Sequence, residues 1–463
     1  MISFPRLIWF LSLIVNTALW ADFNPELFEE RKKSMVFVEY YIQMEVDRQA
    51  GEGVALVAND DGLIVCLGDT FPTWIPPKRF RDIEIFTPNN VAKEGFAAEY
   101  LGQDYVNGWH YLQITDLEAL EFLTPITDFP TDEPAVGEKL WGFGMTNKEM
   151  DYFPYFQDGR LSAVQNLPLP TAFTTVEIAV PGGPVFDFEG DFVGWSQPSF
   201  PLDRDIWIRG EYFQANLRNP DESFMFLLAS PFIEGLGKNI PSTPIDGTRG
   251  WLGVVGSQPL DADTSEFLGL QDQGAVVVSE VLDGSPADLA GLEDRDIILG
   301  INGESFPRFR PNQIVLSFFE REMNQKIEGE TIELSVLRGE ERLSLEATLT
   351  KGPKKLKATD ITYFEELGFS IREFLFGDAV ARREDPNKRT GIIASFVRSN
   401  SPAASAELRS GDWVVEINGQ SIPDTDAAIS VLSQAISSDF EELILLVKRR
   451  NETAVVRIQS ESP

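Results

Sequence analysis

The chain has 463 residues, too many for one hydrophobic core, and a length of this size suggests about three domains. Apolar residues make up 43% and aromatic residues 11%, which is enough core material to exclude an intrinsically disordered chain. The 73 acidic residues outnumber the 39 Lys and Arg, and the net charge of -34 repels phosphate backbones and anionic lipids, so we expect no nucleic-acid partner.

The N-terminus has the layout of a signal peptide. Arg6 is its only charged residue, an apolar run follows at 7–15, and the segment ends in small residues at Ala21. The run is shorter than the roughly 20 residues that span a bilayer, so cleavage after Ala21 is favoured over retention as an anchor. We predict a signal peptide at 1–21, an N-terminal segment at 22–33, and export to the periplasm or extracellular space, with no membrane contact after cleavage.

Residues 34–193 contain short apolar runs separated by Gly, Pro, Asn and Asp. Runs of this length and spacing predict an all-β barrel or sandwich. The predicted strands include 36–38, 54–57, 63–65, 83–86, 111–114 and 140–143. Residues 199–247 are irregular and rich in proline, and we expect a closing segment there with one helix around 223–236.

An internal repeat follows the β-rich region. Residues 285–303 return as residues 401–419 without insertion or deletion, which indicates two copies of one module. In each copy Ser-Pro-Ala predicts the start of a short helix, and Asn-Gly predicts a tight turn because both residues tolerate positive φ. A longer helix, 312–323 or 426–436, and paired strands complete a small sheet capped by helices.

The chain has one cysteine, Cys66, and one histidine, His110. A single cysteine excludes an intramolecular disulfide, and the two residues cannot form a His- or Cys-rich zinc cluster, although a calcium site made of carboxylates stays open. We expect no metal and no cofactor. We interpret Cys66 as a buried small side chain and His110 as a packed strand residue, rather than as a catalytic dyad.

Each module opens with a Leu-Gly-hydrophobic segment, beginning at Leu252 and Leu367. Together with the repeat, these segments resemble PDZ domains in the order found in HtrA proteins, at 248–351 and 359–463 with a linker at 352–358. In that family the loop's N–H groups hold a terminal carboxylate, while the peptide adds a strand to the sheet beside the longer helix. We interpret the glycine of the loop as serving the close approach of a ligand. The resemblance implies a first groove made of Trp251, Leu252, Gly253, Val254, Ile314 and Phe318, and a second made of Glu366, Leu367, Gly368, Phe369, Ala428 and Leu432.

Three fragments of the β-rich region, 61–65, 136–163 and 182–194, resemble trypsin-like HtrA proteases in order and spacing. The resemblance implies a trypsin-like protease domain with its closing segment over 34–247. The fold class is therefore mainly β and multidomain. We predict a degenerate trypsin-like double β-barrel followed by two PDZ domains, each an α+β module with a small sheet capped by helices.

At the positions of that family's catalytic triad, this chain has residues of other types. A protease of this class needs a serine nucleophile, a histidine base, an aspartate that orients the histidine, and N–H groups that hold the oxyanion. The resemblance puts Pro181 at the serine position, Asp69 at or near the histidine position, and Gly108 or Asn107 at the aspartate position. Because proline has neither a hydroxyl nor an N–H, we expect no catalytic residue and no protease activity.

The resemblance thus implies an exported pseudoprotease that binds C-termini or extended strands of other exported proteins, as a scaffold, chaperone-like binder or regulator. Two alternatives stay open: an active serine-type endopeptidase with an unconventional catalytic site, and a regulatory subunit of an active HtrA-type protease. Phe23 and Phe28 could also mediate trimer contacts as in the family, which would make the chain a homo-trimer.

Overall fold

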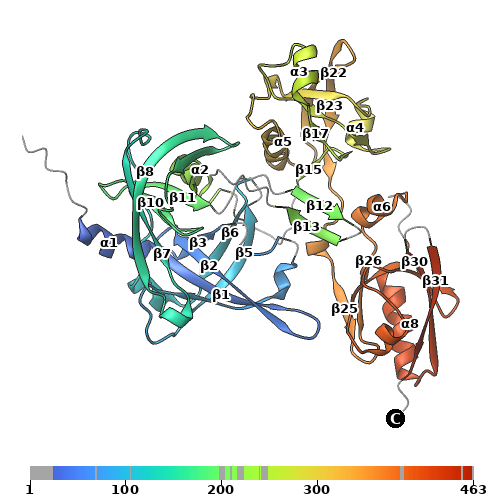
Figure 1. The fold of residues 1–463 in the computed structure, drawn as a ribbon. Coiled ribbons are helices and arrows are strands. Elements are labelled where there is room, and N and C mark those ends of the chain that lie inside the picture. The colour runs from blue at the N-terminus through green and yellow to red at the C-terminus, as the bar shows by residue number, and fades with distance from the viewer. Residues whose placement is uncertain are drawn as a thin grey trace, which may run out of the picture.

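The structure, a computed structural model, describes residues 24–67, 70–73, 75–104, 106–197, 204–208, 211–215, 224–238, 240, 249–385, 390–449 and 452–460. Two barrels lie beside two smaller modules, and the first module lies above the second in Figure 1. The predicted signal peptide at 1–21, Phe23 and Asp69 lie outside the described residues. No helix in the described part of the chain is long and apolar enough to cross a bilayer.

The first barrel is a closed sheet in the order β1-β2-β3-β6-β5-β4, and β1 pairs with β4 to close it. All five strands predicted for this stretch, from 36–38 to 111–114, are confirmed. Its elements are α1 (Pro25–Arg31), η1 (Lys32–Ser34), β1 (Met35–Gln43), β2 (Arg48–Val57), β3 (Leu63–Cys66), η2 (Pro77–Arg79), β4 (Phe80–Phe86), β5 (Phe96–Asp104), β6 (Trp109–Ile114) and η3 (Leu117–Glu121).

The second barrel is closed in the order β10-β11-β14-β9-β8-β7. The helix predicted around 223–236 is wrong over its first part, because residues 224–228 form a strand that fills the place between β9 and β11. A short apolar run suits a buried strand as well as a helix, and the pairing partners decide between them. Its elements are β7 (Lys139–Met145), η4 (Lys148–Met150), β8 (Pro154–Asn166), β9 (Pro170–Thr174), β10 (Pro184–Phe186), β11 (Phe192–Gln197), β14 (Phe224–Leu228) and α2 (Ala229–Gly235), while β12 (Arg204–Ile208) and β13 (Glu211–Ala215) form a separate two-stranded sheet.

The two barrels share one core. The rings of Trp109 in the first barrel and Trp195 in the second have centroids 5.1 Å apart, and Phe232 of α2 packs against both. All three side chains are at most 1% exposed. Because buried aromatic rings remove a large apolar area from water, these contacts hold the barrels together.

The first module contains the sheet β17-β18-β20-β22-β23, in which β21 also pairs with β20, and two separate two-stranded sheets, β16-β19 and β15-β24. Its longer helix begins and ends close to the predicted 312–323. The elements are β15 (Gly250–Trp251), β16 (Val254–Val255), β17 (Gln258–Pro259), α3 (Ala262–Phe267), β18 (Val276–Val277), β19 (Glu280–Val281), α4 (Pro286–Leu289), β20 (Ile297–Ile301), β21 (Glu304–Ser305), α5 (Ile314–Asn324), β22 (Thr331–Arg338), β23 (Glu341–Thr348) and β24 (Thr350–Lys351).

The second module has the sheet order β25-β26-β27-β28-β30-β31. It repeats the described part of the first module and has the further strand β25 at one edge. The elements are η5 (Leu356–Ala358), β25 (Ile361–Phe364), β26 (Phe369–Glu373), α6 (Phe376–Arg382), β27 (Ile392–Val397), α7 (Pro402–Ser405), β28 (Trp413–Ile417), β29 (Gln420–Ser421), α8 (Thr425–Ser437), β30 (Glu442–Arg449) and β31 (Glu452–Gln459).

The local signals of the repeat are confirmed in both modules. Ser285 caps α4 by accepting a hydrogen bond from the amide of Asp288, and Ser401 caps α7 in the same way. Asn302 and Asn418 both have positive φ, as does the glycine after each, so each Asn-Gly pair makes the tight turn that the sequence predicts. The short helix and the turn are therefore specified locally.

Candidate peptide-binding grooves and the cleft between the barrels

In the loop that opens the first module, the carbonyl oxygens of Leu252 and Gly253 accept hydrogen bonds, whereas the amides of the same two residues have no acceptor among the described residues. The amide of Ala287 donates to the oxygen of Leu252 at 2.8 Å, and the amide of Leu282 donates to the oxygen of Gly253 at 3.1 Å. No described residue accepts a hydrogen bond from the amides of Leu252 or Gly253. A pair of unoccupied N–H groups in a loop is suited to an anion such as a terminal carboxylate.

The glycine of each loop has a structural reason that the sequence interpretation missed. Gly253 has φ +92°, and a Cβ atom there would lie closer than 3.0 Å to the side chain of Ser285. Gly368 has φ +74° and meets Ser401 in the same way. The close approach that requires glycine is therefore to the capping serine of the same module, and a ligand is not needed to explain it.

The predicted walls of the first groove lie on β15, β16 and α5. Leu252 and Ile314 are buried in the module core, whereas Val254 and Phe318 are half-buried. Phe318 packs against Phe306 and Phe309. Among the described residues no strand pairs with the outer edge of β16 and β17, the edge that an added strand would extend. Leu167 of the second barrel belongs to the core cluster of this module.

Trp251 lies beside the predicted groove and also contacts the second module. Its ring meets that of Phe376 on α6 edge-on, with centroids 5.7 Å apart. The prediction of Trp251 as a groove wall thus missed its partner in the second module.

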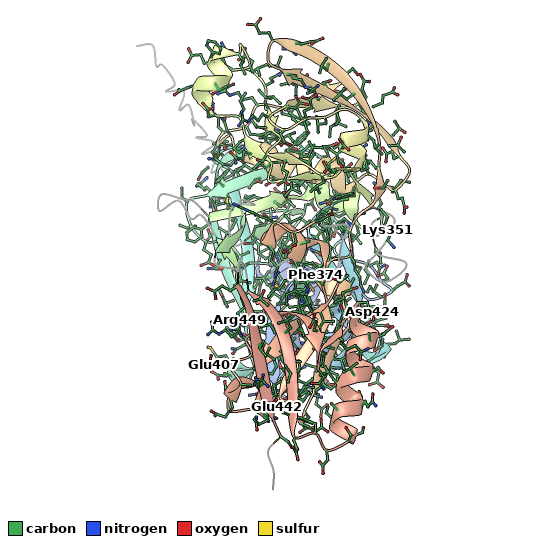
Figure 2. All side chains as sticks on the ribbon, turned by 90° about the vertical axis from the view of Figure 1, so that its right-hand side faces the viewer. Lys351, Phe374, Glu407, Asp424, Glu442 and Arg449 are labelled. Carbon is green, nitrogen blue, oxygen red and sulfur yellow. The ribbon has the colours of Figure 1, made fainter. Side chains whose placement is uncertain are left out.

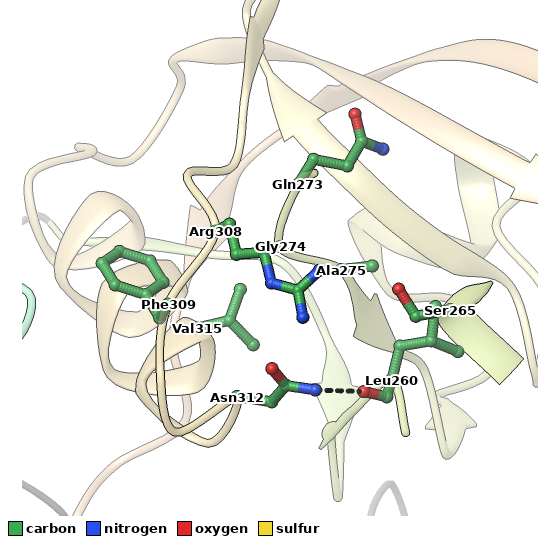
Figure 3. A pocket seen from close by; sticks show the side chains of 9 residues that line it. All are labelled: Leu260, Ser265, Gln273, Gly274, Ala275, Arg308, Phe309, Asn312 and Val315. Atoms are coloured by element: carbon green, nitrogen blue, oxygen red, sulfur yellow. Dashed lines mark hydrogen bonds between the residues drawn. The ribbon is translucent and has the colours of Figure 1, made fainter. Parts of the chain in front are cut away.

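A small hollow lies near the start of α5, where β17 ends (Figure 3). The amide of Asn312 donates to the oxygen of Leu260 at 3.3 Å across it, and Arg308 projects into the same space. The Nε2 atom of Gln273 on its wall is buried without a hydrogen-bond partner. Sequence reasoning did not single out these polar residues, because nothing in the repeat marks them.

The apolar walls predicted for the second groove are buried, whereas Glu366 is exposed. Leu367, Phe369, Ala428 and Leu432 are each at most 1% exposed. The amide of Gly368 donates to the oxygen of Phe364 at 2.8 Å, so one of the loop's N–H groups already has an acceptor. The two loops therefore have the same shape, but only in the second does a described residue accept a hydrogen bond from the amide of the loop's glycine.

In the second barrel, Pro181 lies at a tight turn. The amide of Gly183 donates to the oxygen of Val180 at 2.8 Å, and Gly182 has φ +86°. Proline followed by a residue with positive φ is the pattern of a type II turn. A residue of β11 holds the turn in place, because the indole of Trp195 donates to the oxygen of Gly182 at 2.8 Å. A Cβ atom at Gly182 would collide with Val54 of the first barrel, so the turn fills the space between the barrels.

Gly108 lies in a segment held by residues that sequence reasoning did not identify. The buried carboxylate of Asp104 accepts hydrogen bonds from the amides of Val106 and Asn107. Arg321 of α5 donates to the oxygen of Val106 and, at 3.2 Å, to the side chain of Asn107. Burial lowers the pKa of Arg321, and the negative charge of Asp104 opposes that shift. A contact between segments more than 200 positions apart leaves no local sequence signal.

Cys66 and His110 face each other across β3 and β6. Both are at most 1% exposed, and Nδ1 of His110 lies 2.7 Å from the hydroxyl of Tyr100. Burial raises the pKa of the Cys66 thiol, which disfavours the thiolate that a nucleophile needs. No described group of three His, Cys, Asp or Glu side chains is arranged to hold a metal ion.

Comparisons with known proteins agree with this architecture. The family model described as PDZ domain matches residues 277–315 and 395–450. A Pseudomonas fluorescens protein named "Probable periplasmic serine endoprotease DegP-like" is 27% identical over 278 residues, covering 57% of this chain and 52% of the relative. A Rhizobium meliloti protein of the same name is 28% identical, covering 55% of this chain and 46% of the relative. The chain thus spans about half the length of the curated relatives it matches.

Two solved structures were also matched. The HtrA-type protease AlgW with decapeptide has a TM-score of 0.48 and 17% identity, covering 71% of this chain and 99% of that chain. The serine endoprotease from Yersinia pestis has a TM-score of 0.46 and 15% identity, covering 72% of this chain and 99% of that chain. With two closed barrels followed by two modules that match the PDZ model, the chain is similar in architecture and in sequence to HtrA-type proteins with PDZ domains.

Proposed function

We propose that this chain is an exported, non-catalytic member of the family that binds C-terminal or extended segments of other exported proteins through PDZ1 (the first module) and PDZ2 (the second). The periplasmic names of the relatives support export. In this proposal the double barrel is a scaffold, and the chain acts as a chaperone-like binder or as a regulator.

The observation that carries the non-catalytic half of the proposal is the turn at Val180–Gly183. The family resemblance puts the attacking serine at Pro181, which has no hydroxyl to attack a peptide bond and no N–H to hold the oxyanion. Loss of a single oxyanion donor costs roughly 100-fold to 1000-fold in rate. Gly108, at the aspartate position, supplies no carboxylate, and the chain's one histidine is buried against Tyr100.

The alternative is an active endopeptidase with an unconventional site, which the names of the relatives favour. Ser196 is hydrogen-bonded to the turn through its backbone, but it is buried, and its hydroxyl donates to the oxygen of Ala179 at 3.1 Å. We expect purified protein to hydrolyse casein no faster than buffer at pH 7. Pro181→Ser should leave that result unchanged, because a serine without a base is a poor nucleophile. Casein hydrolysis that a single substitution in the barrels abolishes would establish the alternative.

Peptide binding by PDZ1 has a direct test with a matched control. The probe is a display library of random decapeptides with free C-termini, and affinity for the selected peptide is then measured by fluorescence anisotropy. Phe318→Ala should weaken binding by at least tenfold, because Phe318 is half-buried on α5, which forms one wall of the predicted groove. Phe267→Ala, which removes an 88% exposed ring from the same module, should leave affinity unchanged. Equal affinities of both variants and the wild-type chain would refute binding in this groove.

A regulatory subunit of an active HtrA-type protease is compatible with the same grooves. Co-purification with such a protease and a change in its casein hydrolysis would distinguish a regulator from a stand-alone binder. The trimer prediction stays a proposal as well. Phe28 packs edge-on against Phe143 and Phe156 of its own chain, with centroids 5.8 and 6.2 Å apart.

A further inference from the structure

PDZ2 has an edge strand, β25, without a counterpart in the part of PDZ1 that the structure describes, which does not include residues 246–248. In PDZ1 the segment before the loop, β15, pairs with β24 at the end of the module, and β16 and β17 end the sheet. In PDZ2 the segment before the loop, β25, turns back and pairs with β26. Because β26 corresponds to β16 and β17, β25 lies on the edge that a PDZ ligand would extend.

The direction of β25 is that of a bound C-terminal peptide. It runs antiparallel to β26, from the pair Ile361 and Arg372 to the pair Phe364 and Phe369. Its last residue, Phe364, therefore lies at the carboxylate-binding loop, and the amide of Gly368 donates to its oxygen at 2.8 Å. A backbone carbonyl of the chain itself thus takes a donor that a terminal carboxylate would use.

The side chain of Phe364 is also buried in the way expected of a ligand's C-terminal side chain. It is 7% exposed and belongs to the core cluster that contains Leu367, Ala428 and Leu432. Its ring centroid lies 6.2 Å from that of Phe369. The apolar residues predicted to line the second groove therefore pack in one cluster with a residue of β25.

A short connection holds β25 beside β26. Only four residues, 365–368, connect it to β26, and a tether this short gives an effective concentration of about millimolar or more. Asp360, immediately before β25, forms an ion pair with Lys78 of the first barrel, but both side chains are exposed, so this pair adds little. A competing peptide must therefore displace β25 from the edge of β26.

We propose that β25 is a built-in ligand of PDZ2, with Phe364 in the place of the ligand's C-terminal residue. In the resting chain PDZ1 then carries peptide binding, and PDZ2 accepts only peptides that displace β25. This inference rests on the proposed function of the PDZ grooves and names how one of them is regulated.

The probe for the test is the decapeptide of residues 355–364, labelled at its N-terminus and ending in a free carboxylate. The amides of Thr362 and Tyr363 point in opposite directions, so one of them faces β26. At least one of Thr362→Pro and Tyr363→Pro should therefore release β25 and raise the full-length chain's affinity for the decapeptide by tenfold or more. Thr362→Val, which keeps the strand, should bind like the wild-type chain. A tenfold gain corresponds to a wild-type groove that is open about one-tenth of the time.

A cysteine pair tests the same idea without proline. Tyr363 and Ser370 are direct partners, and the variant Tyr363→Cys with Ser370→Cys can close a disulfide across them. The oxidised protein should bind the decapeptide at least ten times more weakly than the reduced protein, whereas Tyr363→Cys alone should not respond to oxidation. This pair decides the matter if the proline variants fail to fold.

Hydrogen exchange locates the bound peptide. In the released variants, protection on adding the decapeptide should fall on β26 and α8. Equal affinities of wild-type, released and locked proteins, or protection confined to PDZ1, would overturn the inference. The library test with Phe318→Ala is independent of these variants, so failure of PDZ1 binding and failure of PDZ2 occupancy can be distinguished.

Discussion

Gly253→Ala is expected to destabilise PDZ1 by about 3 kcal/mol. Positive φ costs an alanine roughly 1–2 kcal/mol, and forcing a methyl group against a packed neighbour costs roughly 1–3 kcal/mol more. At Gly253 both costs apply, because φ is +92° and the new methyl group would collide with Ser285. Hydrogen exchange of β20 and β22 in the full-length chain gives the free energy of opening of this module alone.

The matched control is Gly284→Ala, one position before the capping serine. Gly284 has φ +72°, but a Cβ atom there has no neighbour within 4 Å. It should cost only the conformational part, roughly 1–2 kcal/mol.

A second check of this explanation removes the collision between the new methyl group and Ser285. Ser285→Gly keeps a tolerated cap residue and should cost only a few tenths of a kcal/mol, so Gly253→Ala in that background should cost less than in the wild-type chain. A loss at Gly253 that equals the loss at Gly284 and is unchanged by Ser285→Gly would contradict this account.

Features set by neighbouring residues were predictable from the sequence. The Ser caps, the Asn-Gly turns and the two longer helices each depend on a few consecutive side chains, and the structure has all of them. The barrel strands were predictable for a related reason, because short apolar runs between turn residues have few alternatives.

Features set by distant partners were not predictable. Residues 224–228 read as part of a helix until β9 and β11 are seen on either side of them. The pairing of β25 with β26 could not be foreseen, because nothing within Ile361–Phe364 marks β26 as its partner. The sequence thus located both loops but not which of them has free N–H groups.

Asp412→Ala is expected to destabilise PDZ2 by about 3 kcal/mol, since it removes the buried carboxylate that pairs with Arg449, which is 22% exposed. The Asp412 side chain is 4% exposed and binds Arg449 through two hydrogen bonds, of 2.6 and 2.7 Å. It also accepts the amide of Arg409 at 2.9 Å, so the loss leaves a backbone donor unpaired as well. The matching pair in PDZ1, Asp296 and Arg338, indicates that this bridge belongs to the repeated module.

Glu442→Ala is the control within the same sheet. Figure 2 labels Glu442 and Arg449, and both lie on β30. Glu442 is 33% exposed and pairs with Arg457, which is 57% exposed, so water screens their attraction and the loss should stay below about 1 kcal/mol. Exchange of the β28 and β30 amides measures both variants. Similar losses at the two sites would mean that burial does not set the strength of the Asp412 bridge, and that the module is held by apolar packing alone.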